Sequence, residues 1–343
     1  MRGAQVRAAV WALIALAGGT RLYGQEPPYH VREFIPIGGA GRWGAAAVDT
    51  ASQRLFVAHA GQIEVVDLVL DTLAGVVPGT PGVRAIAVAD ALGRGFASDG
   101  TDSAVTVFDL RTLTVTDTLG VGAAGPGAIV YDPVSRRVFT MNGPSRDATG
   151  LDAETGLPAG TVPLGGRPAS AVADGRGLIY ANLADRGAVV AFDARSLSVV
   201  RRWSLAPCRR PTALAMDRAH RRLFSGCANG VLVVSDADAG RIVATAPIGR
   251  GVGAAAFDPA SGLVFAACGA DAVVTIVHED DPDHYRVVGG VRTRPGAGIL
   301  ALDPLSHRVF LPVAQLGPAR ARGGRAARPA VVPGTFGVLV LDP

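Results

Sequence analysis

The sequence predicts an all-β protein, a seven-bladed β-propeller built from four-stranded blades. The first sign is an internal period: seven aspartates each follow a short apolar segment and lie 41 to 45 residues apart. The second is an aromatic ring six or seven residues after each aspartate. The third is composition, since 45 glycines and 23 prolines with only 6% aromatic residues are typical of turn-rich packing. The repeated pairs are Asp49 with Phe56, Asp90 with Phe96, Asp132 with Phe139, Asp174 with Tyr180, Asp217 with Phe224, Asp258 with Phe265 and Asp303 with Phe310.

Each repeat of about 42 residues divides into four strand segments, which is the length and pattern of a propeller blade. The first segment is small and apolar, as in Ala45 to Val48 and Ala213 to Met216, and this suits the innermost strand where the blades converge. The repeated aspartate then opens a turn. Proline follows Asp132, Asp258 and Asp303, which favours a type I turn with Asp first and Pro second.

The other three segments follow in order. The second strand carries the aromatic residue, and a loop rich in Gly, Asn or Asp comes after it. The third strand, such as Val105 to Phe108, ends at another aspartate that starts the hairpin into a fourth strand such as Thr114 to Leu119. These hairpin aspartates are Asp67, Asp109, Asp152, Asp193 and Asp236.

Segments such as Arg137-Val-Phe-Thr-Met-Asn-Gly, Leu178-Ile-Tyr-Ala-Asn and Ala104-Val-Thr-Val-Phe-Asp resemble the YVTN (YncE-like) β-propeller repeat family. The resemblance covers essentially the whole chain after its first residues. It implies a seven-bladed propeller, usually exported or on the cell surface and mostly without an assigned activity. Relatives of this architecture include lactonases and domains of redox enzymes, so the resemblance predicts the fold rather than the chemistry.

Two irregularities predict how the ring closes and where it departs from the repeat. The last unit ends after a third strand at Gly337 to Leu341, whereas His30 to Gly38 resembles fourth strands such as Ile242 to Gly249. We therefore expect the N-terminal strand to complete the last blade. The last unit also contains an insertion at about 312–335, which we expect to be a loop without secondary structure.

The first residues predict export. Arg2 and Arg7 precede the apolar run Ala8 to Gly19, which is typical of a secretory signal peptide at residues 1–24 and too short to span a membrane. The remaining residues, 25–343, form one domain that we expect to be periplasmic, at the cell surface or secreted. The chain has no lysine, and without the leader 30 arginines face 29 acidic residues, so we do not expect nucleic-acid binding.

The three cysteines favour one disulfide. Cys208 lies in the loop leading into the fifth unit, and Cys227 ends the second strand of that unit on the same face. Cys268 holds the equivalent position in the next blade, where the separation is expected to exceed about 7 Å between Cα atoms. We predict that Cys208 pairs with Cys227 and Cys268 stays free, with three buried thiols as the alternative.

One run of residues has the chemistry of a metal site. His278 to His284 contains two imidazoles and four carboxylates, but it occupies the hairpin after a third strand, where other units also place acidic turns. We interpret it as a solvated hairpin and predict no metal and no cofactor. His59, His220 and His307 lie in separate blades, and we expect them at the surface.

The loops between second and third strands share one face, and we predict ligand binding there. The insertion adds Arg320, Arg322, Arg325 and Arg328 to this face, so the expected partner is an anionic small molecule, glycan or protein. The candidate binding residues are Asn142, Asn182, Asn229, Asp102, Asp271, Arg320 and Arg322.

The leading interpretation is a monomeric binding or interaction scaffold, and the alternatives are a lactonase-like hydrolase at the channel mouth and an accessory domain of a redox system. Hydrolysis requires a general base or a metal-held water. We expect the innermost strands to contribute no ionisable group before their final aspartate, and we assign no catalytic residue. The hydrolase alternative rests on three acidic residues, Asp102, Asp185 and Asp271.

Overall fold

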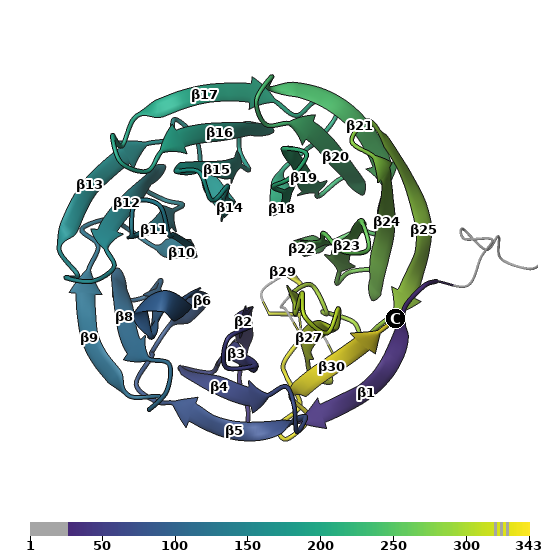
Figure 1. Ribbon diagram of the computed structural model, residues 1–343. Coiled ribbons are helices and arrows are strands. Elements are labelled where there is room, and N and C mark those ends of the chain that lie inside the picture. The colour runs from purple at the N-terminus through teal and green to yellow at the C-terminus, as the bar shows by residue number, and fades with distance from the viewer. Residues whose placement is uncertain (1–26, 319–320, 323–324, 327–328) are drawn as a thin grey trace, which may run out of the picture.

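The computed structural model describes residues 27–343 except 319–320, 323–324 and 327–328. Seven four-stranded antiparallel sheets stand around a central axis, and Figure 1 shows them as the blades of a ring. This confirms the predicted seven-bladed propeller. Among the described residues, no helix has both the length and the apolar character needed to cross a membrane. The predicted signal peptide lies outside the described residues.

The blades share one strand order from the axis outwards. The innermost strands are β2 (Trp43–Asp49), β6 (Val83–Ala89), β10 (Pro126–Asp132), β14 (Pro168–Ala173), β18 (Pro211–Asp217), β22 (Val252–Asp258) and β26 (Ala301–Leu302). The second strands are β3 (Arg54–His59), β7 (Arg94–Asp99), β11 (Arg137–Asn142), β15 (Leu178–Leu183), β19 (Arg222–Cys227), β23 (Leu263–Cys268) and β27 (Val309–Val313). A short 3-10 helix, η1 (Asp90–Leu92), follows β6.

The two outer positions complete each blade. The third strands are β4 (Gln62–Asp67), β8 (Ala104–Asp109), β12 (Asp147–Asp152), β16 (Ala188–Asp193), β20 (Val231–Asp236), β24 (Val273–Asp281) and β30 (Gly337–Asp342). The outermost strands are β5 (Thr72–Val77), β9 (Val115–Gly120), β13 (Pro158–Pro163), β17 (Val199–Ser204), β21 (Arg241–Pro247), β25 (His284–Arg292) and β1 (His30–Pro36).

The N-terminal strand closes the ring, as predicted. The last blade has the order β1-β30-β27-β26, and β1 pairs antiparallel with β30 from His30 opposite Asp342 to Pro36 opposite Gly337. Figure 1 shows the purple β1 lying along the yellow β30 at the rim. Tyr29, just before β1, is buried and donates a hydrogen bond from its hydroxyl to the carbonyl of His307 at 2.8 Å. Closure therefore joins the two ends of the chain in one sheet.

The repeated aromatic residues form the cores between blades. All seven are at most 1% exposed, and each lies on the second strand of its blade. The ring of Phe56 packs 5.6 Å from that of Phe108 in the next blade, and Phe139 lies 5.4 Å from Phe192 in the same relation. Burial of such rings stabilises the contact between neighbouring blades, together with the aliphatic residues around them.

In five of the seven blades an arginine at the start of the second strand joins the blade to the next one, a repeat feature that the sequence pattern contains but that was not predicted. The Arg54 guanidinium donates to the carbonyl of Leu110 in the next blade, and Arg137 donates to that of Ala194 at 2.7 Å. Arg308 joins the last blade to the first through two hydrogen bonds to the Asp71 carboxylate at 2.9 and 3.0 Å. The set comprises Arg54, Arg94, Arg137, Arg222 and Arg308.

The structure joins Cys208 to Cys227 in a disulfide, with a Cα–Cα distance of 5.5 Å, and Cys268 is a buried free thiol. The bond encloses about 20 residues, and constraining a loop of that length in the unfolded chain is worth about 3 kcal/mol. It ties the loop between β17 and β18 to the end of β19.

The insertion differs from the prediction. Instead of a loop without secondary structure, it forms a short hairpin of β28 (Ala321–Arg322) and β29 (Arg325–Ala326), and Leu316 makes an isolated bridge with Val331. The register of a hairpin is fixed by its turn rather than by a hydrophobic period, so the pattern that reveals the blades does not reveal these two-residue strands.

Candidate functional site: the channel mouth

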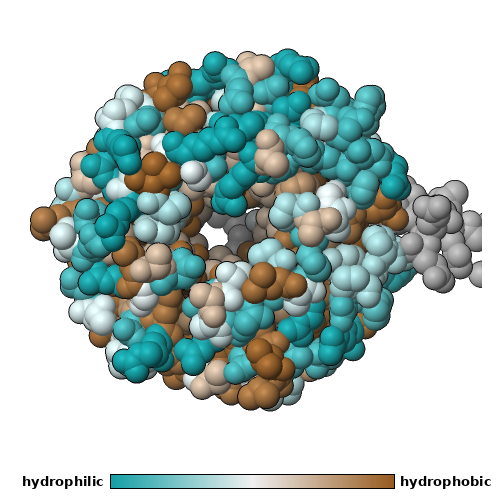
Figure 2. Space-filling view, in the orientation of Figure 1, coloured by the Kyte–Doolittle hydropathy of each residue, from teal (hydrophilic) through white to brown (hydrophobic). Residues whose placement is uncertain are grey.

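The innermost strands begin at one face of the ring, which we call the insertion face because the connection between β27 and β30 emerges there. The loops between second and third strands, and those leading into each innermost strand, meet on it. The opposite face carries the turns of the repeated aspartates. Figure 2 shows the opening at the centre of the ring.

The axial channel is lined mainly by alanine and glycine. Its cavity of about 430 Å³ receives residues from all seven blades. The small side chains predicted for the innermost strands leave this space open. The polar residues in its wall are Arg84, Ser170 and Thr212, and the Thr212 hydroxyl donates to the carbonyl of Val252 at 2.7 Å.

Arg84 corrects the prediction that innermost strands contribute no ionisable group before their final aspartate. It is the second residue of β6 and lines both the channel and a hollow at its mouth. The hollow measures about 540 Å³ and contains a second arginine, Arg167, at the start of β14. We call it the arginine hollow.

Two glycines create the space in which these guanidinium groups lie. A Cβ atom on Gly100 would come within 1.9 Å of Arg84 Nε, and one on Gly143 within 3.3 Å of Arg167 Nε. Each glycine directly follows the second strand of its blade, but Gly100 lies in the same blade as Arg84, whereas Gly143 lies in the blade before that of Arg167. Any larger residue at position 100 would displace the Arg84 side chain.

The two arginines of this hollow differ from their neighbours on the same face in charge pairing. Within the described part of the chain, no carboxylate oxygen lies within 4.0 Å of the Arg84 or Arg167 guanidinium. By contrast, Arg146 pairs with Asp185 at 3.5 Å, and Arg250 pairs with Asp271 at 2.8 Å on the same face. The arginine hollow thus presents two exposed positive charges that no described side chain compensates.

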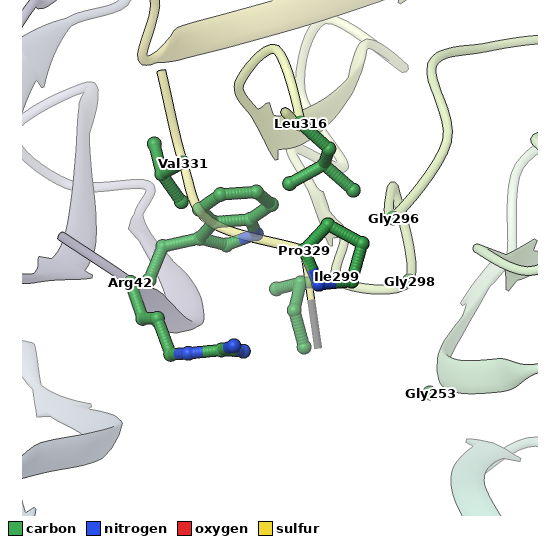
Figure 3. Close-up of a pocket in the computed structure, with 9 residues that line it drawn as sticks. Arg42, Gly253, Gly296, Gly298, Ile299, Leu316, Pro329 and Val331 are labelled. Carbon is green, nitrogen blue, oxygen red and sulfur yellow. The ribbon is translucent and has the colours of Figure 1, made fainter. Parts of the chain in front are cut away.

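A second hollow lies beneath the insertion and is mostly apolar. It measures about 340 Å³, and Figure 3 shows Ile299, Leu316, Pro329 and Val331 gathered around it with Arg42 at its edge. Trp43 and three glycines, Gly253, Gly296 and Gly298, also line it. A pocket with apolar walls and one charged group is the usual form of a small-molecule site.

The channel links the two hollows. Arg84, Gly127 and Ala169 line both the channel and the arginine hollow, whereas Gly253 and Ile299 line both the channel and the apolar hollow. The mouth is therefore one continuous depression, positively charged on one side and apolar on the other.

Two of the predicted binding residues have structural roles instead. Asn142 is fully buried, and its amide nitrogen donates to Asp147 at 2.8 Å and to Thr149 at 2.9 Å. Asn182 is also fully buried and donates to the carbonyl of Ala213 in the next blade. We correct both assignments, because neither amide faces the surface. The sequence predicts both in the loops between second and third strands, whereas Asn142 is the last residue of β11 and Asn182 the next to last of β15, where successive side chains alternate between the two faces of the sheet.

The other predicted residues lie on the insertion face, but the structure does not bring them together into one pocket. Asp102 is exposed, and Asp271 is paired with Arg250. Asn229 is exposed and fastens the loop before β18 by donating to the carbonyl of Pro207 and accepting from the amide of Arg209. Asp185 accepts from the backbone amide of Arg167.

The predicted arginine flap is only partly described. Arg322 and Arg325 lie in β28 and β29. Arg320 and Arg328 lie outside the described residues, so the binding role of the flap stays a prediction.

His59 is buried rather than at the surface as expected. It is 2% exposed, its Nδ1 lies 3.1 Å from Glu64 Oε1, and its ring stacks on Phe336 at 3.8 Å. Burial raises the pKa of Glu64, but hydrogen bonds from His59 and Gln62 outweigh that effect and leave it below its usual value. Because Phe336 directly precedes β30, the stacked His59 ring packs against the point where the insertion returns to the last blade.

Comparison with solved structures agrees on the fold. A structure described as U3-55K superimposes with a TM-score of 0.77 at 12% identity, covering 91% of this chain and 98% of that one. The WD40 repeats of RRP9 give 0.76 at 11% identity, covering 90% and 97%. Hydrazine synthase of Kuenenia stuttgartiensis gives 0.68 at 14%, covering 87% and 96%. At such identities the likeness concerns architecture alone.

No family model matches the chain, and no curated protein matches it either.

Proposed function

We propose that this propeller is a binding scaffold that holds an anionic small molecule, glycan or protein segment at the channel mouth. Its architecture is that of WD40-repeat propellers and fits a binding or interaction role. The observation that carries the proposal is the pair Arg84 and Arg167, which share one hollow without a carboxylate partner among the described residues.

The chemistry of the hollow favours recognition of an anion. Guanidinium groups present a planar fork of donors that matches carboxylate, sulfate or phosphate oxygens. Gly100, Gly125, Gly127 and Gly143 also line the hollow, so a ligand can approach the backbone closely. The neighbouring apolar hollow accommodates an uncharged part of the same ligand.

The mouth favours binding over turnover. Among the described residues that line the channel and the two hollows, none is Asp, Glu, His or Cys. A lactonase-like hydrolase needs a group that removes a proton from water, and these walls supply no such side chain. We therefore keep the scaffold as the proposed function.

We also propose that the protein is exported, on two grounds. Residues 1–24 have the charge and apolar pattern of a secretory leader. The disulfide between Cys208 and Cys227 is of a kind that persists in oxidising compartments. The YVTN-like repeat segments are consistent with both proposals, and membership of that family remains a resemblance.

The test is binding of a heparin-derived tetrasaccharide, measured by calorimetry at two salt concentrations. We expect salt-sensitive binding, because exposed charges are screened as ionic strength rises. Replacing either Arg84→Gln or Arg167→Gln should weaken the affinity about tenfold, since a charge-assisted hydrogen bond is worth about 1.5–3 kcal/mol.

Arg176→Gln is the matched control. Arg176 is exposed on the opposite face, so its loss changes the net charge equally without touching the mouth. The control should bind as the parent does. The proposal fails if the double variant Arg84→Gln/Arg167→Gln keeps the parent affinity, or if the parent binds neither the tetrasaccharide, inorganic phosphate nor citrate.

A further inference from the structure

A second cluster of chemically active side chains lies on the opposite face, away from the mouth. His220 Nδ1 lies 2.7 Å from Asp217 Oδ2 and 3.1 Å from Glu279 Oε1. One donor atom from each of these three residues lies within 4.8 Å of the others. Asp217 is the last residue of β18 in the fifth blade, His220 lies in the turn after it, and Glu279 belongs to β24 in the sixth blade.

His220 is a departure from the repeat. In four other blades the residue three positions after the repeated aspartate is a serine, and in three of them the serine hydroxyl donates to that aspartate at 2.5 or 2.6 Å. In the fifth blade an imidazole takes this position and faces the carboxylate. The donating serines are Ser52, Ser261 and Ser306, and the fourth serine is Ser135.

Glu279 is a second departure, in the neighbouring blade. Its backbone amide donates to the carbonyl of Gly262, a hydrogen bond that five other blades make through a buried leucine or alanine. Of the six blades that make this hydrogen bond among the described residues, only the sixth blade has an ionisable residue at the donating position. The five equivalents are Leu68, Leu110, Ala153, Ala194 and Ala237.

The Glu279 carboxylate is incompletely satisfied. The residue is 8% exposed, and its Oε2 has no hydrogen-bond partner among the described residues. Burial, followed by the negative charge of Asp217, raises the pKa of Glu279 to about 7, against the opposing effects of His220 and Arg222. The nearby Arg222 is occupied elsewhere: it donates to the Pro282 carbonyl and pairs with Asp236 and Asp283. The cluster therefore contains a buried carboxylate oxygen, Glu279 Oε2, to which no described group donates a hydrogen bond.

We propose that Asp217, His220 and Glu279 bind a divalent transition-metal ion of the zinc class between the fifth and sixth blades. One imidazole nitrogen and two carboxylates are ligands that zinc accepts, whereas calcium and magnesium prefer oxygen alone. Small side-chain rotations are needed, because ligand atoms around zinc lie about 3.3 Å apart at its usual bond lengths of about 2.0 to 2.2 Å. The side chain of His220 is 53% exposed, so solvent reaches the remaining coordination position.

This site is independent of the proposed binding function. It lies at the ends of the innermost strands, whereas Arg84 and Arg167 lie at their beginnings. A metal here would fasten two blades together and would offer an open coordination position on the opposite face.

The experiment is a zinc titration of tag-free, chelator-treated protein by calorimetry, with bound metal counted after dialysis. We expect one zinc per chain and, at a hundredfold excess over the dissociation constant, a rise in Tm of about 4 °C or more. Calcium and magnesium should bind at least a hundredfold more weakly.

The variants His220→Ala and Glu279→Gln test the ligands separately. Each should weaken zinc binding at least tenfold, and the half-exposed His220 can be removed without opening the core. His284→Ala is the control, since His284 faces Asp281 at 2.8 Å on the exposed hairpin without a buried third ligand. Failure of the parent to bind zinc at 100-fold excess over protein, or unchanged affinity in His220→Ala, overturns the proposal.

Discussion

A chain that begins at residue 41 should form soluble aggregates or oligomers rather than a monomer, and should lose more than about 10 °C in Tm. Removing β1 strips the edge of β30, whose pairing runs from Gly337 to Asp342. It also removes the buried side chains of Tyr29 and Ile35. An unpaired strand edge is a template for association with another chain. Light scattering after gel filtration and a thermal melt provide the two measurements.

The matched control is a chain that begins at residue 27, which keeps Tyr29 and the whole of β1. It should be monomeric and melt like the parent. If the chain that begins at residue 41 is monomeric and has an unchanged Tm, the pairing of β1 with β30 does not stabilise the ring, and the prediction is wrong.

The substitution Arg221→Ala should lower the free energy of unfolding by about 3–5 kcal/mol in urea. Arg221 is 9% exposed and donates to Asp174 Oδ2 at 2.8 Å and to the Tyr180 hydroxyl at 2.9 Å. The Asp174 side chain is fully buried, so losing Arg221 leaves a buried carboxylate without its cation. This pair also joins the fourth and fifth blades.

Two further variants separate this effect from a general loss of arginine. Arg241→Ala removes an exposed arginine that lies 3.9 Å from Asp236, and it should change stability by less than about 0.5 kcal/mol. Adding Asp174→Asn to Arg221→Ala should restore part of the lost stability, because the uncompensated charge is then absent. A single Arg221→Ala variant within about 1 kcal/mol of the parent would contradict the assignment.

The fold was readable from the sequence because each repeat carries the same local signals at the same offsets. An aspartate that accepts backbone amides in a turn and an aromatic residue that fills the space between blades recur whether or not the surrounding residues match. Ring closure could be predicted for the same reason. The sequence has an extra fourth-strand segment before the first repeat and lacks a fourth strand in the last repeat, and the two strands pair.

The repeats contain a further signal, a recurring arginine, which did not enter the prediction. Arginine stands at the start of the second strand, four or five residues after the repeated aspartate, in five of the seven blades. Its partner is a backbone carbonyl in the next blade, and a carbonyl leaves no residue-type pattern for sequence reasoning to pair with it. The offset identifies the arginine as a repeat position, and only the structure identifies its partner.

The candidate site was harder to predict from the sequence than the fold, for a physical reason. The direction of a side chain at a strand end depends on register and bulges, and most innermost strands show a register shift near their beginning. Asn182 consequently points into the contact between blades, whereas Arg84 opens onto the mouth. The cluster of Asp217 with Glu279 spans 62 positions and two blades, so only the folded ring brings it together.

The central claim, that the channel mouth holds the ligand, is tested most directly by amide hydrogen exchange with and without the heparin-derived tetrasaccharide. We predict slower exchange in residues 100–103, 124–128 and 143–145, which surround Arg84 and Arg167, and no change in the turns of the opposite face at 51–53 and 134–136. Protection confined to the opposite face or the outer rim, or none at a saturating concentration of the tetrasaccharide, would contradict the claim.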